Sequence, residues 1–340
     1  GFWLKKYSAR TLIKLGNLTA ILFYAAIIIL QTQAVKLLIP LGILNGISGG
    51  LFWSGFNLHQ YLSTYKQDRD YYLGIQEFWG NLARITGPLL GGLVITLGNS
   101  LYPHQPLFGY YLLFALSAAV YGLATKDIWS FPRFSGVEFS LTQLKTTLNR
   151  QPQFKSVLFQ QAAWGLRDVS LSTIISILTF LILKQEFTVG LYNSAIGLLT
   201  AVGAFVIGKF LTPVNRVKLA LIGALSYSLS SLILSFWPGF AGLLGFNLLG
   251  IPGLFLAISL GSLFYAVADL DSQPWRLKYA YLVNRDIALN LTRVVSYTLL
   301  WWLFASFSQE TVIRWWLIFV SIPPLIIWIS VQQLSGYVHQ

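Results

Sequence analysis

The sequence has no cysteine, no methionine and few charged residues. Without cysteine the chain can form no disulfide and has no thiol chemistry. Charged residues make up only 10% of the 340 residues, whereas soluble domains carry about 25%. No group of His, Cys and acidic residues has metal-ligand spacing, and no phosphate-binding loop or nucleophile elbow occurs. We therefore expect no enzyme activity, no cofactor, no metal site and no ATP-driven mechanism.

Apolar and aromatic residues are abundant instead. The chain is 55% hydrophobic and 16% aromatic, with a mean hydropathy of +0.64. Apolar segments recur along its length, each long enough to cross about 30 Å of hydrocarbon. Ten such segments lie at approximately 12–31, 35–58, 74–98, 107–124, 156–183, 189–211, 217–237, 240–268, 282–306 and 311–334. The composition predicts an all-α polytopic protein embedded in the lipid bilayer, with aromatic anchors at its interfaces.

Methionine is missing even at position 1. A membrane protein of this length without any methionine is unusual, and we expect that methionine positions have been dropped from the sequence. The spacings given below would then be short by a residue at each such place. Mass spectrometry of the full-length protein checks this expectation.

Basic residues alternate between the two ends of the predicted spans. One set of connections holds seventeen of them: Lys5, Lys6, Arg10, Lys14, Lys66, Arg69, Lys126, Arg133, Lys145, Arg150, Lys155, Lys209, Arg216, Lys218, Arg276, Lys278 and Arg285. The alternate connections hold three, Lys36, Lys184 and Arg314. By the positive-inside rule the first set is cytoplasmic. The net charge of +12 therefore reflects membrane topology rather than nucleic-acid binding, and we expect an integral protein of the cytoplasmic membrane.

The longest polar connection, 125–155, divides the chain into an N-terminal part, 1–124, and a C-terminal part, 156–340. It is basic and partly amphipathic. The favoured interpretation is a cytoplasmic linker that contains an interfacial helix. The alternative is an element that binds a partner.

The two parts contain related segments in the same order. EFWGNLARI (77–85) and DIALNLTRV (286–294) share acid-x3-Asn-x2-Arg-apolar at an offset of 209. GFWLKKYSARTLIKLG (1–16) aligns with GKFLTPVNRVKLALIG (208–223) at an offset of 207, and GLFW with SLFY at 212. Such parallel repeats are typical of transporters built from two similar bundles. Because the second part has six predicted spans and the first has four, we expect about two spans before Gly1 and twelve in the intact protein.

With this repeat, the chain resembles the major facilitator superfamily along essentially its whole length. GFWLKKYSAR is similar to the family's loop between spans two and three, which Gly1, Lys6 and Arg10 fit. Lys5 stands where that loop has an aspartate, so the family's usual gating salt bridge is not matched there. GPLLGG (Gly87–Gly92) is similar to the Gly-Pro-x-x-Gly-Gly motif of the antiporter branch. The resemblance implies two six-helix bundles, spans 3–6 and 7–12 being present here, and secondary transport by alternating access.

Acidic residues near the starts of two spans are predicted to take part in a gating latch. Glu77 and Asp286 lie in first turns beside basic loops, where the helix macrodipole favours an acid. The pseudo-symmetry pairs each acid with the other half's basic loop. The predicted latch consists of Glu77, Asp286, Lys5, Lys6, Arg10 and Lys209. The alternatives are simple helix capping and direct contact with substrate.

Polar residues inside the spans are predicted to line a cavity, because a charge in hydrocarbon is costly. The candidates are Arg84, Arg293, Arg167, Asp168, Asn81, Asn290, Trp53 and Asn57. Positions 77, 81 and 84 form one helical stripe, and positions 286, 290, 293 and 297 form another. The arginines would bind an anionic or polar group of the substrate, and Asp168 would be a protonatable coupling site. The alternative is that these charges form buried ion pairs that lock helices together.

Small residues and prolines are expected to shape the helices. Gly87, Gly91 and Gly92 would let helices approach closely, and Pro88 would bend its helix. Further kinks are predicted at Pro252, Pro323 and Pro324. Several tryptophans, Trp164 among them, are expected to pack or to anchor at interfaces.

The favoured function is proton-coupled efflux of a small amphipathic or anionic solute by a monomer. Two alternatives stay open. One is a flippase for lipid-linked cargo, and the other is a non-transporting membrane sensor.

Overall fold

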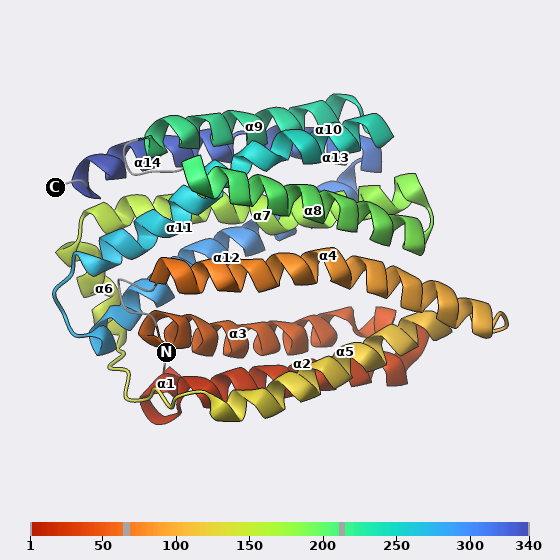
Figure 1. Cartoon of the computed structure of the whole chain (residues 1–340), viewed down its shortest axis with the longest axis horizontal. Coiled ribbons are helices and arrows are strands. Elements are labelled where there is room, and N and C mark those ends of the chain that lie inside the picture. The colour runs from red at the N-terminus through yellow and green to blue at the C-terminus, as the bar shows by residue number, and fades with distance from the viewer. Residues whose placement is uncertain (1, 64–68, 211–214, 339–340) are drawn as a thin grey trace. The chain divides into compact units, whose positions relative to one another are not determined.

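The computed structural model describes the backbone of residues 2–63, 69–210 and 215–338, and their side chains apart from 69–78, 81, 208–210, 262 and 337–338. Within these residues every regular element is a helix (Figure 1). As far as the described residues go, each of the ten predicted spans coincides approximately with one or two of these helices. The helices are α1 (Phe2–Lys6), α2 (Ala9–Leu30), η1 (Gln31–Leu37), α3 (Leu38–Ser63), α4 (Arg69–Leu101), α5 (Phe108–Asp127), η2 (Ile128–Ser130), α6 (Leu141–Arg150), α7 (Gln153–Leu183), α8 (Glu186–Phe210), α9 (Arg216–Phe236), α10 (Phe240–Gly250), η3 (Ile251–Gly253), α11 (Leu254–Asp269), α12 (Trp275–Ser306), α13 (Gln309–Phe319) and α14 (Pro323–Val338).

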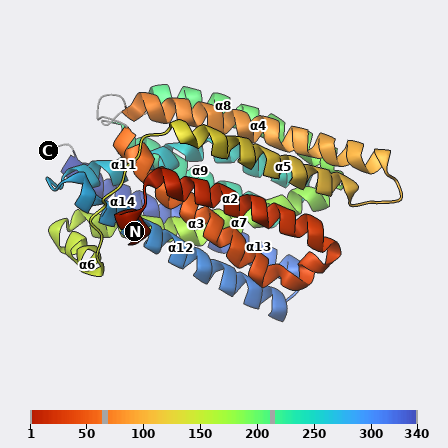
Figure 2. The same cartoon turned by 90° about the horizontal axis from the view of Figure 1, so that it is seen from below.

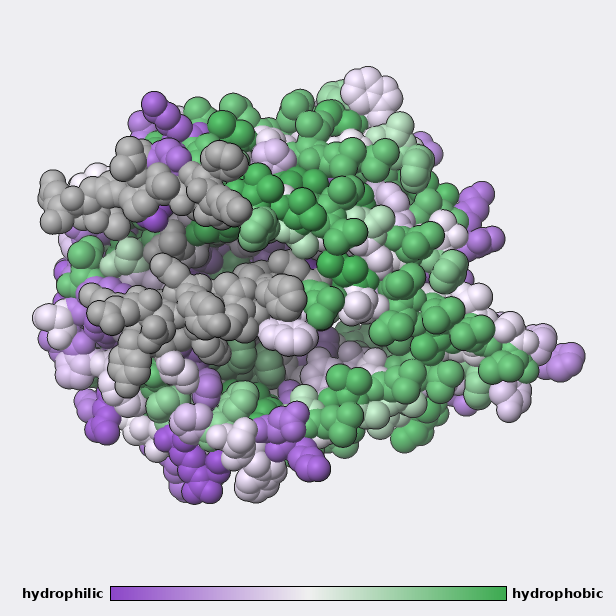
Figure 3. Space-filling view, in the orientation of Figure 1, coloured by the Kyte–Doolittle hydropathy of each residue, from purple (hydrophilic) through white to green (hydrophobic). Residues whose placement is uncertain are grey.

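Eight stretches of the described residues are long and apolar enough to cross a membrane. The first of them, Ala9–Ser63, contains α2, η1 and α3 in succession. Figure 3 shows how these apolar residues are distributed on one face of the protein. Hydrophobic residues cover the middle of the helices of the C-terminal part, and hydrophilic residues gather towards the helix ends. This distribution suits a hydrocarbon layer between two aqueous phases, and the chain is an all-α polytopic membrane protein.

The chain forms two compact units. Unit 1 holds Gly1–Ser140, Glu186–Ser194 and Trp275–Tyr279, and unit 2 holds Leu141–Gln185, Ala195–Pro274 and Ala280–Gln340. In unit 1, α2 packs against α3 and α5, and α4 packs against α5 (Figures 1 and 2). In unit 2, α9 packs against α10, α11, α13 and α14. The helices α2 and α9 carry one of the repeat pairs, so each copy packs against the helices that follow it in its own unit.

Two spans of unit 2 are broken where proline was expected to interrupt them. The span 240–268 is divided into α10 and α11 by η3, which contains Pro252. The span 311–334 is divided after Phe319, and α14 starts at Pro323. Proline has no backbone N–H to donate and its ring clashes with the preceding turn, so a new helix segment starts more easily than the old one continues. Pro88 lies inside α4.

The glycine motif on α4 makes a close approach at only one of its three glycines. A Cβ on Gly92 would lie 2.7 Å from the backbone oxygen of Glu186 in the first turn of α8. A Cβ on Gly91 would be in ordinary contact, 3.8 Å from the Leu113 side chain, and one on Gly87 would meet none of the described residues within 4 Å. Among the described residues Gly87 makes no close contact, and its predicted role in helix packing stays a prediction. The close contact that demands glycine is at Gly92.

The segment 125–155 contains the short helix α6, and its first part is tied to unit 1. Arg10 donates from Nη1 to the carbonyl oxygens of Trp129 at 2.8 Å and Phe131 at 3.3 Å. The backbone N–H of Ala9 donates to Phe134 O at 2.8 Å. His59, which is buried on α3, stacks on Phe131 with ring centroids 4.6 Å apart. These contacts hold the start of the segment against the ends of α2 and α3.

Candidate transport site

In unit 2, helices α7 and α12 pack closely against each other at Gly165. A Cβ on Gly165 would collide with the Leu289 backbone oxygen and with Thr292 Oγ1 of α12. Only a residue without a side chain allows two helix backbones to come this close. Asp168 lies one turn further along α7, and Arg293 follows Thr292 on α12. The approach therefore brings an acid and a base together.

Asp168 and Arg293 form a two-point ion pair between α7 and α12. Arg293 Nε donates to Asp168 Oδ1 at 3.2 Å, and Nη2 donates to Oδ2. The side chains are 16% and 30% exposed, respectively. Arg293 Nη1 also donates to Asn290 Oδ1 at 3.1 Å. Such bidentate, charge-assisted contacts fix geometry as well as energy. Three of the predicted cavity residues thus meet in one network.

The predicted stripe on α12 continues this contact with α7. One turn beyond Arg293, the Tyr297 hydroxyl lies 2.7 Å from Thr173 Oγ1 and 3.3 Å from Val169 O, to which it donates. One turn before Arg293, Asn290 Nδ2 donates to Asp286 O at 2.8 Å. The spacing of four and three residues therefore places these side chains on one face, as expected for 3.6 residues per turn.

Arg167 lies next to Asp168 in sequence but has different neighbours. Its side chain is 5% exposed, and the guanidinium carbon lies 4.4 Å from the centroid of the Tyr227 ring on α9. Nε is buried without a hydrogen-bond partner among the described residues. The Asp168 carboxylate is bound to Arg293 instead. Because a buried charge is costly unless it is paired and hydrogen-bonded, Arg167 is a cation with unused capacity to donate.

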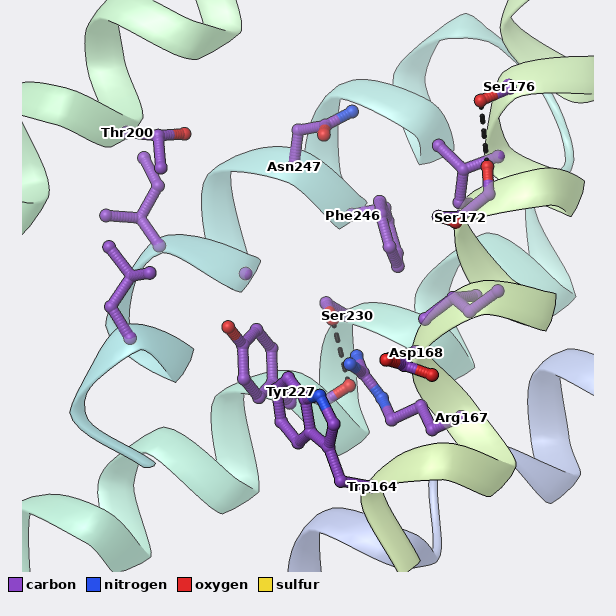
Figure 4. Close-up of a pocket in the computed structure, with 15 residues that line it drawn as sticks. Trp164, Arg167, Asp168, Ser172, Ser176, Thr200, Tyr227, Ser230, Phe246 and Asn247 are labelled. Atoms are coloured by element: carbon purple, nitrogen blue, oxygen red, sulfur yellow. Dashed lines mark hydrogen bonds between the residues drawn. The ribbon is translucent and has the colours of Figure 1, made fainter. Parts of the chain in front are cut away.

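A cavity of about 400 Å³ opens beside Arg167. Its walls come from α7, α8, α9, α10, η3 and α11, all within unit 2. Figure 4 shows the Arg167 guanidinium between Tyr227 and Asp168, with Phe246 and Asn247 contributed by α10. Trp164, which was expected to pack or to anchor at an interface, is the third aromatic residue of the lining, after Tyr227 and Phe246. The helix break at Pro252 borders this space, since Ile251 and Leu254 line the cavity, and a Cβ on the neighbouring Gly253 would collide with the Tyr227 ring.

Most hydroxyl groups that line the cavity already donate a hydrogen bond to a backbone carbonyl oxygen. Ser176, Thr200 and Ser230 each donate to a carbonyl oxygen about one turn earlier, at 2.8, 2.8 and 2.9 Å. Asn247 Nδ2 donates to Leu243 O at 2.9 Å. The hydroxyl oxygens remain available as acceptors, so the strong donor of the cavity is Arg167.

The predicted cavity residues of unit 1 are less enclosed. Trp53 is 55% exposed and stacks edge-on against Phe52 and Phe56, while Asn57 is half-buried on α3. Arg84 is exposed on α4. The Asn81 side chain lies outside the described residues. The roles predicted for these four residues stay predictions.

The predicted latch also stays a prediction. The side chains of Glu77 and Lys209 lie outside the described residues. Asp286 forms an ion pair with the adjacent Arg285 at 2.9 Å. Lys5 and Lys6 are exposed, with Nζ 5.5 Å from the Phe2 ring centroid and 5.9 Å from that of Tyr7. Arg10 holds the segment after α5, as described above.

Sequence reasoning missed Tyr227, Phe246, Gly165 and Gly253. A tyrosine or phenylalanine in an apolar helix carries no signal of what it faces. The glycines had a weak signal. Gly165 lies two and three residues before Arg167 and Asp168, and Gly253 follows Pro252, at which a kink was predicted.

Gly165→Ala is expected to lower the free energy of unfolding of the protein by about 1–3 kcal/mol, as overpacking of a close contact does. The added methyl group would push α7 from α12 and loosen the Asp168–Arg293 pair. Thermal unfolding in detergent measures the effect. Gly261→Ala is the control, since a Cβ there meets no described residue within 4 Å. Equal melting temperatures for the two variants would contradict the close approach.

Comparison with known proteins agrees with this architecture. The family model of the Major Facilitator Superfamily matches residues 1–274. The chain is similar to the fucose:proton symporter FucP of E. coli, with a TM-score of 0.66 and 13% identity over 98% of this chain and 86% of that one. A FucP structure in the outward conformation gives a TM-score of 0.63 and 16% identity over 97% and 84%.

Two curated relatives are similar in sequence. Uncharacterized protein YqgE of Bacillus subtilis (strain 168) is 25% identical over 302 residues, which cover 86% of this chain and 67% of that protein. The uncharacterized protein in the sodM 3′ region of Geobacillus stearothermophilus is 25% identical over 138 residues, 37% of this chain and 62% of that protein.

The matched family model covers well over half of the chain, and the helical architecture agrees with it. The chain therefore belongs to the Major Facilitator Superfamily, and it is a membrane transporter of the secondary type rather than an enzyme.

Proposed function

We propose that the protein couples proton movement to the transport of a small amphipathic or anionic solute, with Asp168 as the coupling residue. The Asp168–Arg293 pair between α7 and α12 carries this proposal. A carboxylate inside a membrane span is costly and usually functional. Protonation of Asp168 would remove the negative charge that holds Arg293. The pair thus has two states, and proton binding selects between them.

The cavity supports a small solute. Its volume of about 400 Å³ lies in the range of about 300–1,000 Å³ that is usual for small-molecule sites. That size and the enclosed position of Arg167 favour a small solute over lipid-linked cargo. Asp168 borders the cavity and also binds Arg293. Solute binding and proton binding therefore occur on two sides of one carboxylate.

We propose efflux across the cytoplasmic membrane, by alternating access of a monomer, as the direction of transport. The support is the similarity of Gly87–Gly92 to the antiporter motif. The basic loops and the segment 125–155 would lie on the cytoplasmic side, in accordance with the positive-inside rule. The predicted latch would close that side in the outward-open state.

A proteoliposome experiment tests coupling and direction together. Benzenesulfonate is a suitable probe because it stays anionic and does not cross a bilayer by protonation. Vesicles loaded with it are expected to lose it faster when the outer solution is made acidic, since an antiporter exchanges an entering proton for a departing solute. A protonophore should remove the difference. Accumulation towards the alkaline side would indicate symport and overturn efflux, and flux without any gradient dependence would overturn proton coupling.

A further inference from the structure

We infer that the cavity inside unit 2 binds a small aromatic monoanion, whose charged group is held by Arg167 and whose ring lies among Trp164, Tyr227 and Phe246. This inference rests on the proposed function and deepens it by naming the class of ligand. The site is built within one unit, on the α9 side of α7. The Asp168–Arg293 pair lies on the α12 side.

Arg167 is the reason why we infer a negatively charged ligand. Arg167 as a whole residue is 95% buried, its guanidinium stacks on one aromatic ring, and Nε has no hydrogen-bond partner among the described residues. A carboxylate or sulfonate in the cavity could accept two parallel hydrogen bonds from the guanidinium, which its planar fork is shaped to make. An anion would also offset the cost of burying the cation.

The same arrangement disfavours a cationic ligand. Among the described residues that line the cavity, Asp168 is the one acid, and both its oxygens accept from Arg293. An ammonium group would find no free carboxylate and would lie close to the Arg167 charge. Repulsion between two poorly solvated like charges is strong. The site therefore discriminates by the sign of charge.

The aromatic and apolar side chains in the rest of the cavity lining are the reason why we infer an aromatic ligand. The Trp164 and Tyr227 ring centroids are 6.1 Å apart with the ring planes tilted by 57°, so the two rings form a corner rather than a stack. Phe246 faces them from α10 (Figure 4), and the rest of the lining includes Leu171, Ile175 and Leu254. A flat apolar ring makes edge-to-face and offset contacts in such a corner.

Equilibrium binding to the purified protein in nanodiscs, without any proton gradient, tests this assignment. Benzoate is the probe, and benzamide is its neutral analogue of nearly the same shape. Wild-type protein is expected to bind benzoate saturably and more tightly than benzamide. Arg167→Gln should weaken benzoate binding by about 10-fold or more, the usual value of a charged hydrogen bond, and leave benzamide unaffected. Arg167→Lys should be intermediate, because it restores the charge without the fork.

Matched controls separate the site from general effects. Arg314→Gln removes an exposed arginine that stacks on Phe236, outside the cavity lining, and should leave binding unchanged. Tyr227→Leu removes one of the rings of the site and should bind both probes more weakly. Benzamide binding as tight as benzoate, equal benzoate affinity in Arg167→Gln, or no saturable benzoate binding by wild type would each overturn the assignment. Binding without gradient-driven flux would instead overturn only the coupling, because this measurement needs no gradient.

Discussion

Asp168→Asn is expected to abolish proton-driven transport and to destabilise the protein. Asparagine cannot exchange a proton at neutral pH, so the coupling step is lost. It also leaves Arg293 without its counter-ion in a position where the side chain is only 30% exposed. Breaking a fully buried pair in this way costs about 3–5 kcal/mol, and we expect about 2–3 kcal/mol here because both side chains are partly exposed. Thermal unfolding in nanodiscs and benzenesulfonate flux measure the two effects.

The double variant Asp168→Asn/Arg293→Gln separates coupling from a structural lock. Removing both charges should recover most of the lost stability, because no unpaired charge remains. If the pair only locks α7 to α12, gradient-driven flux should return with the stability. If Asp168 is the coupling residue, flux should stay independent of the proton gradient. A stable double variant with normal proton-driven flux would therefore contradict the proposed role. Glu310→Gln is the control, since Glu310 is an exposed acid at the start of α13.

Arg167→Met is expected to have effects of opposite sign on stability and on ligand binding. Arg167 forms no ion pair within 4 Å among the described residues, and replacing buried ionic groups by apolar side chains of similar size can stabilise a protein by about 1–4 kcal/mol. The lost contact with the Tyr227 ring offsets about 1 kcal/mol of this gain. The same change removes the strong donor of the cavity, so benzoate binding should become undetectable. A residue kept for ligand binding at the expense of stability shows this combination.

Thermal unfolding of ligand-free Arg167→Met, compared with wild type, decides whether this arginine is structural. An arginine that holds helices together would instead give a lower melting temperature when it is removed. Arg314→Met is the matched control, because it replaces an arginine by methionine at an exposed position and should change stability little. Loss of stability in Arg167→Met with unchanged benzoate affinity would reverse the assignment.

The membrane class, the helical spans and the breaks within them were predictable from the sequence, for a local reason. Hydrocarbon thickness sets the length of an apolar segment, and a proline acts on its own helix turn. The breaks at Pro252 and Pro323 could therefore be located without knowing any neighbour. The stripe 286, 290, 293 and 297 was predictable in the same way, since a helix repeats every 3.6 residues.

Contacts between helices were decided by the tertiary structure. Gly87 and Gly92 belong to one motif, yet of the two only Gly92 has a backbone against it in the part of the chain that the structure describes. Arg167 and Asp168 are adjacent, but side chains about 100° apart on a helix face different neighbours. Arg293 on α12 lies on one side of α7, and Tyr227 on α9 lies on the other. The sequence by itself placed two opposite charges inside a membrane helix. Only the packing of α9 and α12 around α7 paired the acid with Arg293 and left the base facing a cavity.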